Sequence, residues 1–364
     1  MKAAISIFIA TIFLFSIFTY AFVDIHIPYL HFLFTGFYLD HRHMLTAIYF
    51  FFTLVLYGCF YYIVNRSIDF NYDSGKITFL IIVSTIFSYP AALTFDIFNY
   101  LTTAKVVFHY HENPYVVYPI EFINEPYLLF TRAANKLALY GPFWILLTSI
   151  PYFLGFGNFI LTVFSFKAFV ALFYILTVYL IKKMDKRAVL FFALNPLVII
   201  ETLISSHNDI VMVFFVLLSI HLLHKEKTLS IISYIGSILI KFSTLFLLPA
   251  YIFVLMRKTR EEAVYLYGAI SMLVIFLLSP LREELYPWYA IWVIAFTAFL
   301  HKNKMLQSVV IFLSLGLALR YIPYMATGNY FGPTPMIKIV LTILPISVFL
   351  VWSIIKKQLK NFIN

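Results

Sequence analysis

The sequence predicts an all-α polytopic membrane protein, with about ten full transmembrane helices, one broken helical hairpin and one outer loop that carries juxtamembrane helices. Two observations lead to this fold class: 63% of the 364 residues are hydrophobic, and only 12% are charged. In soluble proteins about a quarter of the residues are charged. A chain with half of that fraction of charged residues cannot cover the surface of a soluble domain with polar groups. Most of the surface of this protein must therefore face lipid.

Ten apolar runs are the expected spans, because a hydrocarbon core of roughly 30 Å needs about 20 apolar residues. They are residues 3–23, 44–64, 77–95, 159–181, 188–204, 210–223, 263–280, 288–300, 305–323 and 336–355. The first run follows Lys2 and is shaped like a signal peptide, but its length and the spans after it favour a retained helix. No soluble segment of domain size separates the runs, so we expect residues 1–364 to form a single membrane domain.

Two stretches do not fit ordinary spans. Residues 142–156 are short and follow a polar loop, whereas residues 229–256 are too long for one span and too short for two, with Lys241 near their middle. We expect the first stretch at the outer interface and the second as a broken hairpin with both ends cytoplasmic. Then 17 of the 26 Lys and Arg residues fall on one side. The positive-inside rule makes that side, which holds both termini, cytoplasmic.

The net charge of +10 does not indicate a nucleic-acid partner. Basic residues form short clusters between apolar runs, for example at 182–187 and 257–260, which is typical of cytoplasmic anchors in a cell-membrane protein. No His, Cys and Asp residues have metal-ligand spacing, and no phosphate loop, nucleophile elbow or dinucleotide fingerprint is present. We therefore expect neither a metal nor a cofactor.

In this topology the outer face contains most of the polar residues that could take part in catalysis or binding. They lie in loop 96–141 and in segments 205–209, 282–288 and 328–335. Asp96 follows a span directly, and a partly desolvated carboxylate suits a general base that acts on a hydroxyl. Taken alone, Asp96 is explained as well by a helix cap or a solvated loop acid. The aromatic residues suit a sugar, although an interfacial aromatic belt has the same composition. The candidates for substrate binding are Tyr100, Asn113, Tyr115, Tyr140, Asn208, Asp209, Tyr286 and Trp288.

Three cationic or basic residues are candidates for binding a phosphate group: Lys241, His207 and Arg282. Lys241 would lie inside the membrane, where a charge costs roughly 2.5 kcal/mol or more. It is therefore either functional or paired with a buried acid such as Glu201. His207 could bind a phosphate, position an acceptor or cap a turn.

Six short motifs occur in order along the chain. They are residues 96–100 (DIFNY), 112–115 (ENPY), 140–144 (YGPFW), 194–197 (LNPL) with 207–209 (HND), 240–242 (IKF) and 286–289 (YPWY). Their order and spacing resemble those of GT-C glycosyltransferases, multispan enzymes that use polyprenyl-phosphate sugars. The resemblance is greatest to polyprenol-phosphate-mannose-dependent mannosyltransferases, and it runs from about residue 95 to residue 292.

The resemblance implies a GT-C-like fold, a reaction and a site. Asp96 matches the acid that these enzymes use as catalytic base, and 142–156 matches a juxtamembrane helix, so 96–158 would form the outer catalytic loop. Many relatives carry two acids in that loop, whereas Ile97 follows Asp96 here, and Glu112 is the candidate for the second carboxylate. The implied reaction is inverting transfer of a hexose, mannose by resemblance alone, from a polyprenyl-phosphate donor to a glycan or glycolipid acceptor at the outer face. Donor, acceptor and membrane lipids are the expected partners.

The same sequence allows two other functions. A lipid flippase or secondary transporter would line a route through the membrane with polar residues, and a non-catalytic subunit would serve a glycan-assembly complex. The chain has no internal repeat and gathers its polar residues on one face, which favours the enzyme over the carrier.

Overall fold

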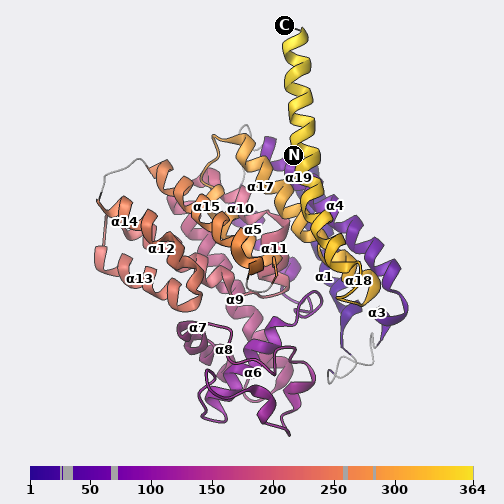
Figure 1. Cartoon of the computed structure of the whole chain (residues 1–364), viewed down its shortest axis with the longest axis vertical. Coiled ribbons are helices and arrows are strands. Elements are labelled where there is room, and N and C mark those ends of the chain that lie inside the picture. Colours follow the sequence, from indigo (N-terminus) through magenta and orange to yellow (C-terminus); the bar gives the residue numbers. More distant parts are fainter. Residues whose placement is uncertain (25–26, 28–35, 67–72, 257–260, 282–283, 364) are drawn as a thin grey trace.

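The computed structural model describes residues 1–24, 27, 36–66, 73–256, 261–281 and 284–363. Throughout these ranges the chain forms helices joined by turns and loops, with no strand, so the predicted all-α membrane fold is confirmed. The helices pack into one body, with the 96–158 region at one end and the C-terminal helix projecting from the other (Figure 1).

Six helical segments are long and apolar enough to cross a membrane, and each coincides with an expected span. They are α1 (Lys2–Phe18) with η1 (Thr19–Phe22), α4 (Arg42–Arg66), α9 (Phe159–Met184), α15 (Glu261–Leu278) with η8 (Ser279–Leu281), α17 (Lys304–Leu319) with α18 (Tyr321–Thr327), and α19 (Thr334–Ile363). Only 11% of the apolar window in α19 is buried, so most of this helix faces outward, where lipid covers apolar side chains. The chain is therefore an integral membrane protein.

Three further expected spans are helices of only 10–17 residues. They are α5 (Ser74–Thr85), α12 (Asp209–Leu222), and η9 (Pro287–Tyr289) with α16 (Ala290–Thr297). The expected span 188–204 is a helix pair bent by 66°. It contains η5 (Lys186–Ala188), α10 (Val189–Ala193), α11 (Pro196–Ile199) and the π-helical turn η6 (Ile200–Ile204). By length and composition, the described part of the chain has six crossings, or seven with the bent pair, and ten complete crossings stay a prediction.

The bend has a local cause. The side chain of Asn195 accepts the backbone N–H of Leu197, and Pro196, which has no N–H to donate, begins the next helix. The buried ammonium of Lys167 then donates to the carbonyl of Leu203, within the π-helical turn, at 2.6 Å. Turns of this kind are frequent at functional sites, and this one leads directly into the polar turn before α12.

The stretch from 229 to 256 is the broken hairpin that the sequence predicts. It contains α13 (Lys227–Ile240), η7 (Phe242–Leu247) and α14 (Leu248–Met256). The rings of Tyr234 and Tyr251 stack at 4.4 Å, and Ser230 Oγ lies 2.6 Å from the hydroxyl of Tyr251, so the two arms lie side by side. Lys241 separates the arms in an extended conformation, with φ at −152°. The side of the membrane on which the arms end stays a prediction.

The 96–158 region is built from short helices. They are α6 (Asp96–Phe108), η3 (Pro119–Glu121), η4 (Pro126–Leu129), α7 (Pro142–Leu147) and α8 (Ser149–Leu154); one further short helix, α3 (Phe37–Asp40), precedes α4. Leu146 of α7 and Phe153 of α8 are exposed. Exposed apolar side chains on short helices are typical of segments that lie at a membrane interface, as expected for residues 142–156.

A buried ion pair ties this region together. Lys105 Nζ lies 2.7 Å from Glu125 Oε2, and the hydroxyl of Tyr110 donates to the same carboxylate at 2.6 Å. Burial raises the pKa of Glu125, but Lys105 and Tyr110 lower it, and the net pKa lies below its ordinary value. Because Lys105 belongs to α6, the pair attaches the loop to the helix that begins at Asp96.

Candidate active site

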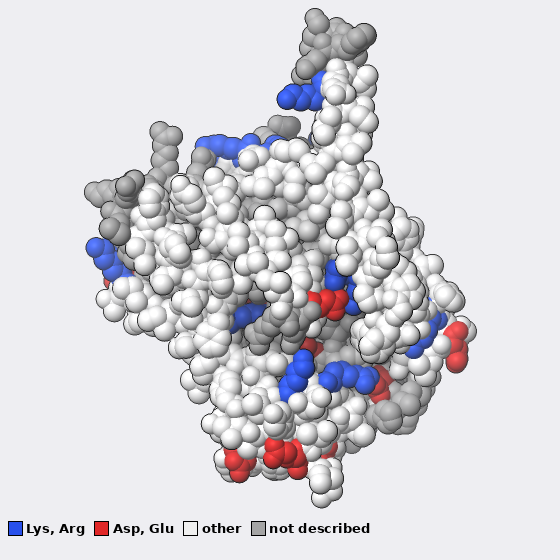
Figure 2. All heavy atoms as spheres, viewed as in Figure 1, with Lys and Arg blue, Asp and Glu red and all other residues white. Residues whose placement is uncertain are grey.

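A cavity of about 610 Å³ lies between the 96–141 region and the transmembrane helices. Its wall combines the start of α6, loop residues between 132 and 141, the turn before α12, the tip of the hairpin, the end of α15, residues between 284 and 292, Arg320, and residues of α18 and α19. Acidic and basic side chains gather around the hollow on this face of the molecule (Figure 2). Segments that are far apart in the sequence thus enclose one space, lined by charged and apolar side chains, next to the membrane-facing helices.

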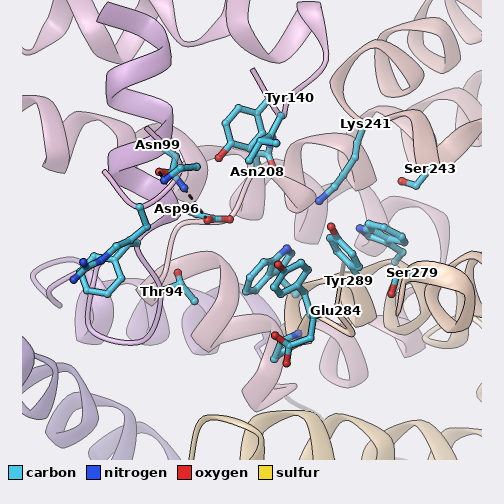
Figure 3. Close-up of a pocket in the computed structure, with 18 of the residues that line it drawn as sticks. Thr94, Asp96, Asn99, Tyr140, Asn208, Lys241, Ser243, Ser279, Glu284 and Tyr289 are labelled. Carbon is cyan, nitrogen blue, oxygen red and sulfur yellow. Dashed lines mark hydrogen bonds between the residues drawn. The ribbon is translucent and has the colours of Figure 1, made fainter. Parts of the chain in front are cut away.

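Asp96 is the first residue of α6, and its carboxylate points into the cavity (Figure 3). Asn99, one turn further along the helix, donates to Asp96 Oδ1 at 3.3 Å. The positive end of the helix dipole favours a carboxylate at this position. No side-chain capping bond is present at this end of α6, and the Asp96 side chain is 26% exposed. Asp96 is therefore a cavity-lining acid and not a helix cap.

A fully buried histidine lies behind Asp96. His207 Nδ1 is 3.4 Å from Asp96 Oδ2, and His207 Nε2 is 3.2 Å from Glu201 Oε2. The imidazole ring stacks on Trp288, with ring centroids 4.0 Å apart. Burial lowers the pKa of His207, but the carboxylates of Asp96 and Glu201 raise it, and the net pKa rises from 6.5 to about 9. The two acids that enclose His207 thus favour its protonated, cationic form.

Lys241 approaches the cavity from the tip of the hairpin (Figure 3). Its ammonium lies 2.8 Å from Asp209 Oδ1, and the indole N–H of Trp292 donates to the same oxygen at 2.6 Å. The ammonium also lies 4.3 Å from the centre of the Tyr289 ring, a cation–π contact. Lys241 is therefore paired with a buried acid, Asp209 instead of Glu201, and at the same time borders the cavity.

A second cluster of charged side chains lies in another part of the cavity wall. Glu284 Oε1 lies 2.7 Å from Arg320 Nη2 and 2.9 Å from Lys338 Nζ. All three residues line the cavity. Arg320, at the junction of α17 and α18, and Lys338, in α19, lie within apolar segments, where a charge is costly. Their position in the sequence was therefore a signal of an interior polar site. Arg132 and Lys136 also line the cavity, but they lie in a polar loop, where a cation carries no such signal.

The structure brings nine of the predicted site residues together. The cavity wall contains Asp96, Tyr140, Asn208, Lys241, Tyr286 and Trp288. Tyr100, His207 and Asp209 pack directly behind the wall. Tyr100 holds the wall in place, because its hydroxyl donates to Asn208 Oδ1 at 3.3 Å.

The other predicted site residues lie elsewhere. Glu112 is exposed and does not line the cavity, so its role as a second carboxylate stays a prediction. Asn113 accepts the backbone N–H of Tyr115 at 3.0 Å, and the hydroxyl of Tyr115 donates to the carbonyl of Tyr140 at 2.7 Å. These two residues shape the loop beside the cavity. Arg282 lies outside the described residues.

In the ranges that the structure describes, no group of three or more His, Cys, Asp or Glu residues is placed to hold a metal ion. The chemical groups that line the cavity are carboxylates, ammonium and guanidinium groups, amides and aromatic rings. This set can take a proton from a hydroxyl, bind an anion and stack against a sugar ring.

Two family models match the chain. The model described as alpha-(1->6)-mannopyranosyltransferase, N-terminal domain, matches residues 10–257, and the model described as MptB C-terminal domain matches residues 205–354. The first covers more than half of the chain, and the two overlap in the segment that contains His207 and Lys241. No curated protein and no solved structure gives a significant match.

Proposed function

The chain belongs to the alpha-(1->6)-mannopyranosyltransferase family and has a mannosyl-transfer role, and from this premise we propose its donor, its mechanism and its site. The donor is a polyprenyl-phosphate mannose, and the acceptor is a glycan or glycolipid. Transfer takes place at the outer membrane face, in the cavity beside Asp96, within the catalytic region 96–158.

The observation that carries this proposal is that Asp96 and Lys241 approach one cavity from different elements (Figure 3). Transfer of a sugar from a phosphate to a hydroxyl needs a base for the hydroxyl proton and a positive partner for the departing phosphate. A carboxylate and an ammonium group that face the same space meet both needs. Tyr140, Asn208, Tyr286 and Trp288 add ring faces and hydrogen-bonding groups for the sugar.

The charge of the cavity supports an anionic donor. Two carboxylates, of Asp96 and Glu284, line the described wall, against five cations: Arg132, Lys136, Lys241, Arg320 and Lys338. Asp209 offsets the charge of Lys241 from behind the wall, and Glu284 offsets part of the charge of Arg320 and Lys338. Cations thus outnumber carboxylates among the residues that line the described wall, which suits a phosphodiester.

The apolar edge of the cavity supports a lipid-linked donor. Phe242 and Phe246 of η7 and Leu278 of α15 line the cavity and are also 62%, 48% and 42% exposed. Large apolar side chains that join an internal polar space to the outer surface of a membrane protein face lipid. A donor with its phosphate near Lys241 could extend its polyprenyl chain over this edge into the bilayer.

In the proposed reaction, Asp96 accepts the proton of an acceptor hydroxyl as the hydroxyl oxygen bonds to the anomeric carbon. The bond between that carbon and the phosphate oxygen breaks, and its electron pair leaves with the polyprenyl phosphate. Lys241 stabilises the negative charge that develops there. Attack opposite the phosphate inverts the anomeric carbon, so an alpha-linked product requires a beta-linked donor.

The arrangement of the two ends of the molecule supports an outer location of the site. The 96–158 region lies at the opposite end of the molecule from the C-terminal helix (Figure 1). If the basic clusters hold both termini on the cytoplasmic side, the cavity faces outward.

The test is transfer of radiolabelled mannose from polyprenyl-phosphate mannose to membrane acceptors by the purified protein. Asp96→Asn should remove transfer while the protein stays folded, because the amide cannot accept the proton. Asp40→Asn is the matched control, since Asp40 is exposed and does not line the cavity. Full transfer by Asp96→Asn would refute the base, and no transfer by the wild type with this donor would refute the proposed donor.

A further inference from the structure

The side chains of Asp96, His207 and Glu201 form a chain of charged groups that leads from the cavity wall into the protein. His207 Nδ1 faces Asp96 Oδ2 at 3.4 Å, and His207 Nε2 faces Glu201 Oε2 at 3.2 Å. Glu201 Oε1 in turn accepts the hydroxyl of Tyr321 at 2.9 Å. Asp96 and Tyr321 line the cavity, whereas His207 and Glu201 are completely buried.

Burial prevents His207 from touching a substrate. Its exposed fraction is 0%, and the ring is fixed on one face by Trp288 and at Nε2 by Thr94 Oγ1, 3.2 Å away. The backbone is fixed too, because the N–H of His207 donates to the carbonyl of Glu201 at 2.9 Å and Ser206 adopts a left-handed φ of 62°. Such a conformation persists in a non-glycine residue where the surroundings enforce it. The phosphate of a donor in the cavity would meet Trp288 or Asp96 before the imidazole.

Charge explains why a histidine lies here. A carboxylate without a cation is very unfavourable in a buried site, and Glu201 has no exposed surface. One imidazolium between two carboxylates balances the charge of Glu201 and faces Asp96 at once. The charged and titratable groups around it are Asp96 from α6, Glu201 from η6 and, through Glu201, Tyr321 from α18; Thr94 and Trp288 are neutral.

We propose that His207 is the positioning residue of the catalytic base: as a buried cation anchored by Glu201, it holds the carboxylate of Asp96 toward the cavity. Asn99 donates to the other carboxylate oxygen at 3.3 Å, so each oxygen of the carboxylate faces a partner within the protein. This inference rests on the proposed role of Asp96. It replaces the phosphate-binding role that the sequence indicates for His207 with a role that acts through Asp96.

The first test is the steady-state kinetics of His207→Gln in the full-length protein, with polyprenyl-phosphate mannose as donor. A misplaced base lowers kcat, and a displacement of about 1 Å can reduce it about 100-fold. We expect a loss of this size in kcat, with the KM for the donor changed less than about threefold, because no donor contact is removed. His301→Gln is the matched control, since the ring of His301 lies 3.5 Å from Asp185 and away from the cavity. A normal kcat in His207→Gln, or a raised donor KM with a normal kcat, would overturn the proposal.

The second test is the pH profile of kcat, which a purely structural role would not change in shape. The pKa of His207 is raised to about 9, so wild-type kcat should fall as the pH rises through this value. His207→Gln should lack this alkaline decline. Glu201→Gln removes one of the two carboxylates that raise the pKa, and its decline should begin at a lower pH. A Glu201→Gln profile identical to that of the wild type would overturn the proposal, even if His207→Gln does not fold.

These outcomes separate the inference from the function on which it rests. If the wild type transfers mannose and Asp96→Asn does not, but His207→Gln keeps both its kcat and its alkaline decline, only the positioning role fails. If the wild type does not transfer mannose from this donor, the proposed function fails, and the positioning role falls with it.

Discussion

The ammonium of Lys241, at the tip of the broken hairpin, lies 2.8 Å from the carboxylate of Asp209, the first residue of α12. The two side chains differ in exposure: that of Lys241 is 23% exposed at the cavity, whereas that of Asp209 is buried behind it. Asp209 thus stabilises a cation at the edge of an apolar hairpin, and Lys241 in turn balances the charge of a buried acid. The stability of the hairpin tip and the charge of the cavity therefore depend on the same pair.

This dependence predicts the behaviour of a double-variant cycle. Lys241→Gln should lower kcat about 100-fold, as expected for the loss of a charge that stabilises a leaving group. Lys241→Gln and Asp209→Asn should each destabilise the protein, by about 3 kcal/mol, because each leaves one charge without its partner. The double variant should regain most of the stability and none of the activity. Thermal unfolding in detergent and transfer kinetics measure the two effects; a double variant as unstable as the sum of the single variants would contradict the pairing.

The apolar edge of the cavity should control access of the donor. Phe246→Gln is expected to raise the KM for polyprenyl-phosphate mannose about tenfold, because roughly 1.5 kcal/mol of contact with the lipid chain is lost. A donor with a truncated chain should show little difference between variant and wild type. Phe153→Gln is the control, since Phe153 is also an exposed phenylalanine but does not line the cavity. The same KM change with both donors would exclude a contact with the chain.

The pair of Lys105 and Glu125 should make the 96–158 region sensitive to acid. The pKa of Glu125 is lowered in the folded state, so its stabilising contribution is present above the ordinary glutamate value and is lost as the pH falls through the lowered pKa. Glu125→Gln should reduce the free energy of unfolding by about 3 kcal/mol at neutral pH. The difference in stability between the wild type and this variant should become smaller as the pH falls below about 4. Thermal unfolding across this pH range tests the ion pair. A stability difference between variant and wild type that does not depend on pH would mean that the variant loses packing and not an ion pair.

Substitution of Glu112, outside the cavity, should affect the protein less than substitution of Glu284, in the cavity wall. Glu112→Gln should keep transfer activity within about threefold of the wild type, because its carboxylate is exposed outside the cavity. Glu284→Gln should lower both stability and activity, since it leaves Arg320 and Lys338 without their carboxylate. A 100-fold loss of kcat in Glu112→Gln alone would support a second catalytic carboxylate in this loop.

Several features of the site could be predicted from single positions. Asp96 stood out because a carboxylate next to a span is costly unless it is used or satisfied, and Lys241 stood out because it interrupts an apolar stretch. Glu112 lies close to Asp96 along the chain, but the turn at 109–114 leads it to the exposed side of the loop. His207 was identified as a polar residue of interest, yet its role depends on two acids whose distances from it no local pattern contains.

The sequence alone determined that this protein is a helical membrane protein, because transfer of a segment into lipid depends on the composition and length of that segment. It also determined where helices break, since Pro196 and Lys241 act on their own neighbours. Only the tertiary structure decided that Asp96, Glu201 and His207 form one chain of charges, and that Lys241 pairs with Asp209 and not with Glu201. The physical reason is that these contacts join separate helices, and their packing, which depends on the whole chain, sets which buried charges can meet.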